Sequence, residues 1–221
     1  MKITSILSTV AVAASVVSAG PILAKRSVET RTELDDGDEA SCPKVILIYG
    51  RGSTEVGNMG EFDAPGPILA AALEGLFDSI WIQGIGGAYT ASVAANLLPK
   101  GTTNAAIAEA KRLYTLAHTK CPNSAVVTGG YSQGAALVAA SLSELAGTAV
   151  QEQVKGAVLF GYTKNKQNGG RIPNYPTERT AIYCEKNDAV CFGTLFVLPD
   201  HFQYGDEAAE EAPAFLASLV G

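Results

Sequence analysis

The sequence predicts an α/β fold in which a mostly parallel sheet of five strands is flanked by helices. Five short apolar runs recur along the 221 residues, and none of them alternates apolar with polar residues as a strand with one wet face does. Segments with apolar residues at helical spacing separate these runs. Strands that alternate with helices in this way join a parallel sheet through right-handed crossovers.

Composition allows a single domain and disfavours several classes of partner. The chain is 47% hydrophobic, enough to bury a sizeable core, and it is too short for two full-sized catalytic domains. Its net charge of −6 disfavours nucleic acid and anionic membrane surfaces as partners. It has two histidines, His118 and His201, and neither an H-E-x-x-H nor a C-x-x-C pattern, so we expect no metal site and no cofactor.

Residues 1–19 have the features of a secretory signal peptide. Lys2 precedes an apolar stretch that runs from about residue 6 to residue 17, and residues 17–19 (Val-Ser-Ala) provide small side chains at the cleavage position. A transmembrane anchor is the alternative, but the apolar stretch is shorter than the roughly 20 residues that a span needs. We therefore expect a secreted, extracellular protein without a stable membrane anchor.

Two segments separate the signal peptide from the predicted fold. The dibasic pair Lys25-Arg26 marks a candidate second processing site, which makes residues 20–26 a candidate propeptide. Residues 27–41 contain six acidic side chains, and we expect them to form a solvated, flexible arm. Because residues 1–26 carry three bases and no acid, their removal changes the net charge from −6 to −9.

The first half of the fold contains two predicted strands and two predicted helices. Residues 45–49 (VILIY) and 80–83 (IWIQ) are continuous apolar runs, as expected of strands that are buried on both faces. Residues 67–77 and 104–118 instead repeat apolar side chains at helical spacing. One stripe of the second helix contains Ala106, Ile107, Ala110, Leu113 and Leu116.

The second half continues the alternation of strands and helices without a linker between domains. Residues 164–176 are rich in Asn, Gly and Pro, and we expect a surface loop there. The remaining apolar runs predict strands, and the Ala-rich segments between and after them predict helices. The predicted elements of this half are strands at 125–128, 156–161 and 180–184 and helices at 134–145 and 208–219.

Residues 130–134 (GYSQG) fit the pattern G-x-S-x-G, with Ser132 at its centre. The bare pattern is weak, but here it directly follows a predicted strand and directly precedes a predicted helix, as a nucleophile elbow requires. Its glycines allow the tight turn that brings strand and helix close together while Ser132 projects its hydroxyl. Ser132 is therefore the predicted nucleophile, and an incidental serine in a glycine-rich loop is the alternative.

A serine nucleophile needs a base, usually a histidine that a carboxylate orients. The chain order in folds with this elbow is serine, acid, histidine, and His201 is the only histidine after Ser132. Asp188 and Asp200 are the main candidates for the acid. Asp200 is badly placed because neighbouring side chains on an extended loop diverge, so Asp188, after the fifth predicted strand, is preferred. Less favoured candidates are Glu144, Glu152, Glu178 and Glu185.

Four cysteines in a secreted chain imply two disulfides, which allow three connectivities. Cys184 and Cys191 enclose a six-residue loop and are the natural local pair, which leaves Cys42 for Cys121. The local bridge would hold the loop of Asp188 rigid.

The oxyanion of a tetrahedral intermediate needs hydrogen-bond donors. One donor is expected from the backbone N–H of Gln133, the residue after the nucleophile. The second is expected from the loop after an earlier strand, where residues 51–54 (RGST) offer Ser53.

Five stretches carry a family resemblance: 48–55 (IYGRGSTE), 81–84 (WIQG), 129–136 (GGYSQGAA), 159–165 (LFGYTKN) and 171–175 (RIPNY). Together they resemble the secreted fungal cutinases, from about residue 42 to the C-terminus and including all four cysteines. The resemblance implies that residues 42–221 form one small, lidless α/β-hydrolase domain that hydrolyses carboxylic esters of the plant cuticle polyester. It also implies Ser132, Asp188 and His201 as the catalytic triad, Ser53 and Gln133 at the oxyanion hole, and the disulfides Cys42–Cys121 and Cys184–Cys191.

The resemblance further implies an acyl-binding groove between two apolar loops. Val93 would lie on one side, and Leu195, Val197 and Phe202 on the other. An exposed apolar rim around a serine can be wetted by a waxy polymer without a lid. Phe202 and residues 62–65 depart from the family pattern, which affects the preferred acyl length and leaves the chemistry unchanged.

The sequence therefore predicts a secreted, monomeric serine esterase that acts on insoluble cutin and on short-to-medium acyl esters through an acyl-enzyme. An acetyl xylan esterase of the same fold is the nearest alternative. From a different class, the alternative is a non-catalytic secreted protein that binds the plant surface or acts in signalling. That class is disfavoured because every catalytic position holds a competent residue.

Overall fold

The computed structural model describes residues 28–220 and contains one five-stranded sheet, with the strands in the order β2-β1-β3-β4-β5. All four pairs of neighbouring strands are parallel. The predicted five-stranded sheet is therefore confirmed, and it is parallel throughout. The strands are β1 (Val45–Gly50), β2 (Ile80–Gly84), β3 (Ala125–Tyr131), β4 (Val154–Phe160) and β5 (Thr180–Tyr183).

The predicted signal peptide (1–19) and candidate propeptide (20–26) lie outside the described residues, and both stay predictions. Across residues 28–220, no helix combines the length and the apolar character that crossing a membrane requires.

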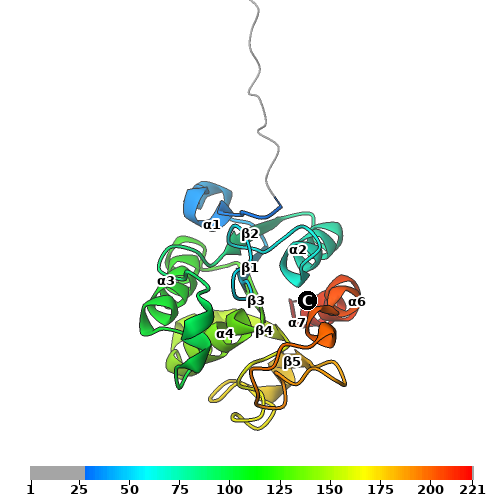
Figure 1. Ribbon diagram of the computed structural model, residues 1–221. Helices are drawn as coiled ribbons and strands as arrows, with labels where there is room; N and C mark the ends of the chain where they lie inside the picture. The colour runs from blue at the N-terminus through cyan, green and yellow to red at the C-terminus, as the bar shows by residue number, and fades with distance from the viewer. Residues whose placement is uncertain (1–27, 221) are drawn as a thin grey trace, which may run out of the picture.

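Helices cover both faces of the sheet because successive side chains of a strand point to opposite sides (Figure 1). In β1, Ile46 and Ile48 belong to one apolar core, whereas Leu47 and Tyr49 belong to the other. The first core lies under α3 (Asn104–Lys120) and α4 (Gln133–Glu144), and the second under α2 (Pro65–Leu76), α6 (Gly205–Ala209) and α7 (Glu211–Val220).

The predicted helices 67–77, 104–118 and 134–145 correspond to α2, α3 and α4, whose ends differ from the predicted ones by at most two residues. The predicted last helix, 208–219, is wrong in one respect, because the structure divides it into α6 and α7. Pro213 has no N–H to donate to the carbonyl four residues earlier, so it lies in the first turn of a new helix. Short helices that the sequence did not predict are α5 (Ala149–Gln153), η2 (Val93–Leu97), η3 (Thr177–Arg179) and η4 (Pro199–Phe202).

The acidic segment 27–41, predicted to be a flexible arm, is instead packed against the sheet over its described residues. It contains α1 (Glu33–Asp36) and η1 (Glu39–Ser41), and Leu34 is completely buried in the core beneath α3. The Glu33 carboxylate accepts the backbone N–H of Ile82 on the edge strand β2 at 2.7 Å. The prediction was wrong because it weighed the acidic residues alone, whereas the burial of Leu34 and several hydrogen bonds to the edge strand fix the segment.

Replacing Leu34 with alanine is expected to lower the free energy of unfolding by about 3 kcal/mol, since it leaves a cavity in the core. Urea denaturation of the two proteins measures the difference. Val28, in the same segment but half exposed, provides the matched control, and Val28→Ala is expected to change stability by less than about 0.5 kcal/mol. Equal stabilities of Leu34→Ala and Val28→Ala would mean that the segment is not part of the cooperative fold.

The carboxyl ends of four strands meet at one edge of the sheet. Gly50 pairs with Gly130, Tyr131 with Phe160, and Phe160 with Tyr183, so β1, β3, β4 and β5 end side by side. Loops that follow these strands carry most of the predicted site residues. Open parallel sheets form their ligand sites at this edge.

Both predicted disulfide pairings are confirmed. Cys42–Cys121 joins the segment before β1 to the residue that follows α3. Cys184–Cys191 closes the loop directly after β5. Asp188 lies within this second loop, so the bridge restrains the position of its backbone.

Candidate active site

Ser132 lies on a sharp turn between β3 and α4, as the G-x-S-x-G pattern predicts. Its φ is 54°, a value that costs a non-glycine residue about 1–3 kcal/mol. The turn persists because its surroundings fix it: the Ser132 N–H donates to the Phe160 carbonyl at 2.9 Å. At Gly134 a Cβ atom would collide with the backbone of Gly50, so α4 packs on β1 only because this position has no side chain.

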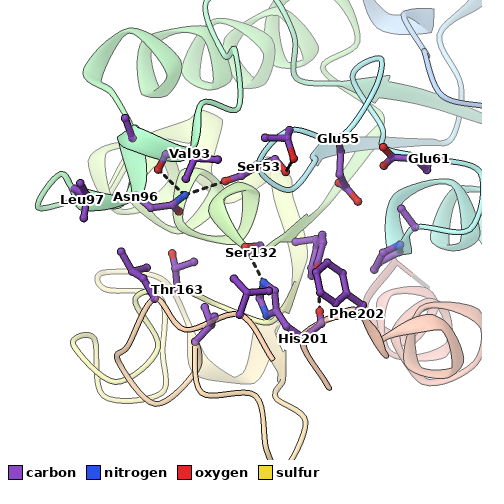
Figure 2. A pocket seen from close by; sticks show the side chains of 18 of the residues that line it. Ser53, Glu55, Glu61, Val93, Asn96, Leu97, Ser132, Thr163, His201 and Phe202 are labelled. Carbon is purple, nitrogen blue, oxygen red and sulfur yellow. Dashed lines mark hydrogen bonds between the residues drawn. The ribbon is translucent and has the colours of Figure 1, made fainter. Parts of the chain in front are cut away.

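The structure brings together the three residues predicted to form the triad, of which Figure 2 shows Ser132 and His201. His201 Nε2 lies 2.9 Å from Ser132 Oγ, and His201 Nδ1 lies 2.8 Å from Asp188 Oδ2. Asp188 and His201 are buried, at 0% and 2% exposure, while Ser132 is 9% exposed at the floor of a cavity. A carboxylate can only accept, so the Asp188 contact leaves the proton on Nδ1 and the lone pair of Nε2 directed at the Ser132 hydroxyl.

Asp188 is held as a buried carboxylate by several donors. Burial opposes its ionisation, but hydrogen bonds from His201 and Tyr204 outweigh that effect and lower the pKa of Asp188 below its ordinary value. The backbone N–H of Val190 adds a further bond at 3.0 Å. Asp200, the other main candidate for the acid, instead accepts from the side chain of Asn187.

The remaining candidates and the second histidine lie elsewhere. Glu144 forms ion pairs with Lys100 and Lys111 on the surface, and the His118 ring contacts the side chain of Gln153 at 3.1 Å. None of these groups is among the residues that line the cavity above Ser132.

Ser53 and Gln133, predicted to form the oxyanion hole, are in direct contact. The Gln133 side-chain amide donates to Ser53 Oγ at 3.0 Å, and the Asn96 amide donates to the same oxygen at 2.9 Å. Two donors occupy the lone pairs of this hydroxyl, so its own proton is free to point into the cavity. Sequence reasoning missed Asn96, which lies in the short helix η2 and belongs to no motif.

The cavity has a volume of about 610 Å³ and contains the four residues expected to line an acyl groove. Val93 lies on one side of Ser132 and Phe202 on the other, as Figure 2 shows. The four expected side chains are between 46% and 70% exposed and Leu97 is 78% exposed, so the cavity has an apolar rim that faces solvent. The rim side chains that also line the cavity are Val93, Leu97, Leu195, Val197 and Phe202.

The end of the cavity near Phe202 is acidic. Figure 2 shows Glu55 and Glu61 on this side of Ser132. Burial, together with the nearby Glu61 and Asp63 carboxylates, raises the pKa of Glu55 to about 7, although a hydrogen bond from the Gly52 N–H opposes the shift. Glu55 therefore changes charge near neutral pH.

Replacing Glu55 with glutamine is expected to stabilise the protein at pH 8 and to have little effect at pH 5. The folded-state pKa of about 7 lies above the ordinary 4.5, so the folded wild type binds more protons and loses stability as pH rises from 4.5 through 7. The shift corresponds to up to about 3 kcal/mol at pH 8. Urea denaturation at both pH values measures the difference in free energy of unfolding between the variant and the wild type.

Glu39→Gln, at an exposed glutamate, is the matched control and is expected to leave the stability nearly unchanged at both pH values. A Glu55→Gln protein whose stability follows that of the wild type between pH 5 and pH 8 would contradict the prediction.

Within residues 28–220, no group of three or more His, Cys, Asp or Glu side chains is arranged to hold a metal ion.

Comparisons with known proteins identify the family of the chain. The chain matches the Cutinase family model over residues 41–220. It is 53% identical to the cutinase of Colletotrichum truncatum, over 97% of this chain and 99% of that protein. A Trichoderma reesei cutinase solved with a C11Y4 phosphonate inhibitor is 28% identical, with a TM-score of 0.74 over 87% of this chain and 80% of that chain.

A solved acetyl xylan esterase is 18% identical, with a TM-score of 0.66 over 82% of this chain and 100% of that chain, a likeness of fold alone. These relatives confirm the α/β-hydrolase fold that the family resemblance implied. The chain therefore belongs to the cutinase family of carboxylic ester hydrolases.

Proposed function

We propose that the protein is a secreted, monomeric serine esterase that hydrolyses ester bonds of cutin and of short-to-medium acyl esters through an acyl-enzyme. The observation that carries this proposal is the hydrogen-bonded chain Asp188–His201–Ser132, which opens into a cavity with an apolar rim.

In the first half of the reaction, His201 Nε2 takes the proton of Ser132 Oγ, and Oγ forms a bond to the ester carbonyl carbon. Asp188 stabilises the imidazolium that results. The tetrahedral intermediate collapses when the carbon–oxygen bond to the alcohol breaks and His201 gives its proton to the leaving oxygen. The alcohol departs, and the acyl group remains on Ser132.

In the second half, water replaces the alcohol. His201 takes a proton from a water molecule, whose oxygen attacks the acyl carbon, and the bond to Ser132 Oγ then breaks as Oγ regains a proton from His201. A carboxylic acid leaves and the enzyme returns to its starting state. Each half-reaction thus uses the same base and the same oxyanion hole.

Ser53 and Gln133 are proposed to stabilise the oxyanion in both steps. The Gln133 backbone N–H lies at the N-terminus of α4, whose positive end faces the reacting centre. The Ser53 hydroxyl is held by two amide donors, so its proton needs no reorientation when negative charge develops.

The apolar rim favours the binding of a waxy substrate over that of a polysaccharide. Sugars present many hydroxyl groups that need polar partners, whereas Leu97, Leu195 and Val197 offer only hydrocarbon. A non-catalytic role for the protein is disfavoured because both contacts of the triad, Asp188 to His201 and His201 to Ser132, are within hydrogen-bond distance.

The deciding experiment compares hydroxy fatty acids released from purified cutin with acetate released from acetylated xylan, alongside a p-nitrophenyl ester series of increasing acyl length. We expect cutin monomers to be released and acetate release to be slow. Enzyme blocked with a p-nitrophenyl phosphonate is the control, and mass spectrometry should find one phosphonyl group on Ser132. Rapid release of acetate without any cutin monomer would instead assign the protein as an acetyl xylan esterase.

A further inference from the structure

Tyr204 is a fully buried side chain whose hydroxyl contacts the carboxylate of the triad. The hydroxyl donates to Asp188 Oδ2 at 2.5 Å. The same oxygen accepts the Nδ1–H of His201 at 2.8 Å. One carboxylate oxygen therefore holds two donors, and only one of them belongs to the proposed triad.

A second partner fixes the direction of the Tyr204 hydrogen bond. The backbone N–H of Glu185 donates to the Tyr204 hydroxyl oxygen at 3.1 Å, so the single hydroxyl proton is left for Asp188. Glu185 and Asp188 lie in the loop after β5, whereas Tyr204 lies two residues after η4, which carries His201. The hydroxyl thus ties the loop of the acid to the turn of the base.

The ring of Tyr204 is enclosed by aromatic side chains. Its centroid lies 6.1 Å from those of Tyr131 and Phe160, and 6.4 Å from the perpendicular ring of His201. Burial, with the adjacent Asp188 charge, raises the pKa of Tyr204 well above its ordinary value. The hydroxyl therefore keeps its proton throughout the working pH range and acts only as a donor to Asp188.

We propose that Tyr204 is a positioning residue of the esterase reaction, which fixes the orientation of Asp188 and limits how strongly that carboxylate attracts a proton to His201. This inference rests on the proposed function, because it concerns the base of that reaction. A donor on a charged oxygen withdraws negative charge from it. With Tyr204 in place, Asp188 therefore stabilises the imidazolium less than a carboxylate oxygen bound to His201 alone.

Other charged or titratable groups also surround His201. Tyr131, at the end of β3, donates to the His201 carbonyl and is kept neutral because burial raises its pKa. Asp200 precedes His201 in the chain, and Glu185 flanks Tyr204. Glu55 lines the same cavity and titrates near pH 7, within the range of a histidine. A test must therefore read the His201 ring directly and separate it from Glu55.

The test is an NMR titration of the His201 imidazole in wild-type protein and Tyr204→Phe, each also carrying Glu55→Gln. We expect the pKa of His201 to rise by about half a pH unit or more in Tyr204→Phe. The acid limb of kcat/KM for p-nitrophenyl butyrate is expected to move by the same amount, and kcat to fall about tenfold with little change in KM.

Tyr175→Phe is the matched control, because Tyr175 is also buried and its hydroxyl donates to the Val154 carbonyl away from the triad. This variant is expected to leave the His201 pKa unchanged. A Tyr204→Phe protein that only loses stability, with the same His201 pKa as the control, overturns the proposal.

Incorporation of 3-fluorotyrosine at position 204 gives an independent test if Tyr204→Phe fails to fold. The ring keeps its shape, and fluorine makes the hydroxyl a stronger donor, so the pKa of His201 should fall instead of rise. An unchanged or raised value overturns the proposal. Because the titration does not depend on turnover, it separates this inference from the proposed function, which fails on its own if Ser132→Ala retains activity.

Discussion

Replacing Ser132 with alanine is expected to lower kcat for p-nitrophenyl butyrate by about 10⁵- to 10⁶-fold. The variant removes the atom that would form the acyl-enzyme, and no other hydroxyl lies at the position facing His201 Nε2. The oxyanion hole and the cavity remain, so a residual rate above that of the uncatalysed reaction is expected. Initial rates with active-site titration of the wild type measure the loss.

Three further variants distinguish lost chemistry from lost structure. His201→Ala is expected to lower kcat by a similar factor. The double variant with Ser132→Ala should have nearly the same kcat as either single variant, because the two residues act as a unit. His118→Ala should keep wild-type activity, since its ring contacts Gln153 outside the cavity. A Ser132→Ala protein that keeps more than about 1% of wild-type activity would contradict the mechanism.

Stability measurements on a variant of Ser132 test whether the backbone at this position is strained. The backbone of Ser132 has a positive φ, which glycine adopts without strain. We expect Ser132→Gly to raise the free energy of unfolding by about 1 kcal/mol while remaining inactive. Such a result would mean that the fold accepts local strain at this turn in order to present the hydroxyl.

Replacing Gly134 with alanine is expected to destabilise the protein by more than about 4 kcal/mol, or to prevent folding. An added Cβ would overlap the backbone carbonyl of Gly50 and approach the carbonyl of Arg51 to 2.5 Å. Both neighbours are main-chain atoms of the segment that leads from β1 to Ser53, so no side-chain rotation can relieve the contact. Relief requires α4 to move away from the sheet.

Gly75 is the matched control for this prediction. It lies on the exposed side of α2, and a Cβ atom there would meet nothing within 4 Å. Gly75→Ala is therefore expected to stabilise the protein by about 0.5–1 kcal/mol. Thermal unfolding should give a lower midpoint for Gly134→Ala and a slightly higher one for Gly75→Ala. Equal midpoints for the two variants would show that the close approach of α4 to β1 is not required.

The secondary structure was predictable because buried parallel strands and amphipathic helices leave clear local patterns. The run VILIY became β1, and the helix expected over 104–118 became α3. The triad followed from a motif, a fixed chain order and the small number of histidines, which together left one base. These features depend on neighbours in the sequence or on simple counting, so no tertiary contact is needed to read them.

Long-range contacts decided what the sequence could not. Leu34 lies in an acidic segment, and its burial beneath α3, with the hydrogen bond from Ile82 to Glu33, shows that the segment belongs to the fold. Asn96 and Tyr204 occur outside any motif, and each donates a hydrogen bond to a predicted site residue in another segment, Ser53 or Asp188.

Local patterns therefore determined the fold class of this protein and pointed to Ser132 and His201 as its proposed nucleophile and base. The tertiary structure alone decided the environment of the site: which donors hold Ser53 and Asp188, and why Glu55 titrates near neutral pH. The physical reason is that burial and hydrogen-bond partnership depend on distances between segments that are remote in sequence. Those distances are fixed only when the chain folds and the carboxyl ends of the strands lie side by side in the sheet.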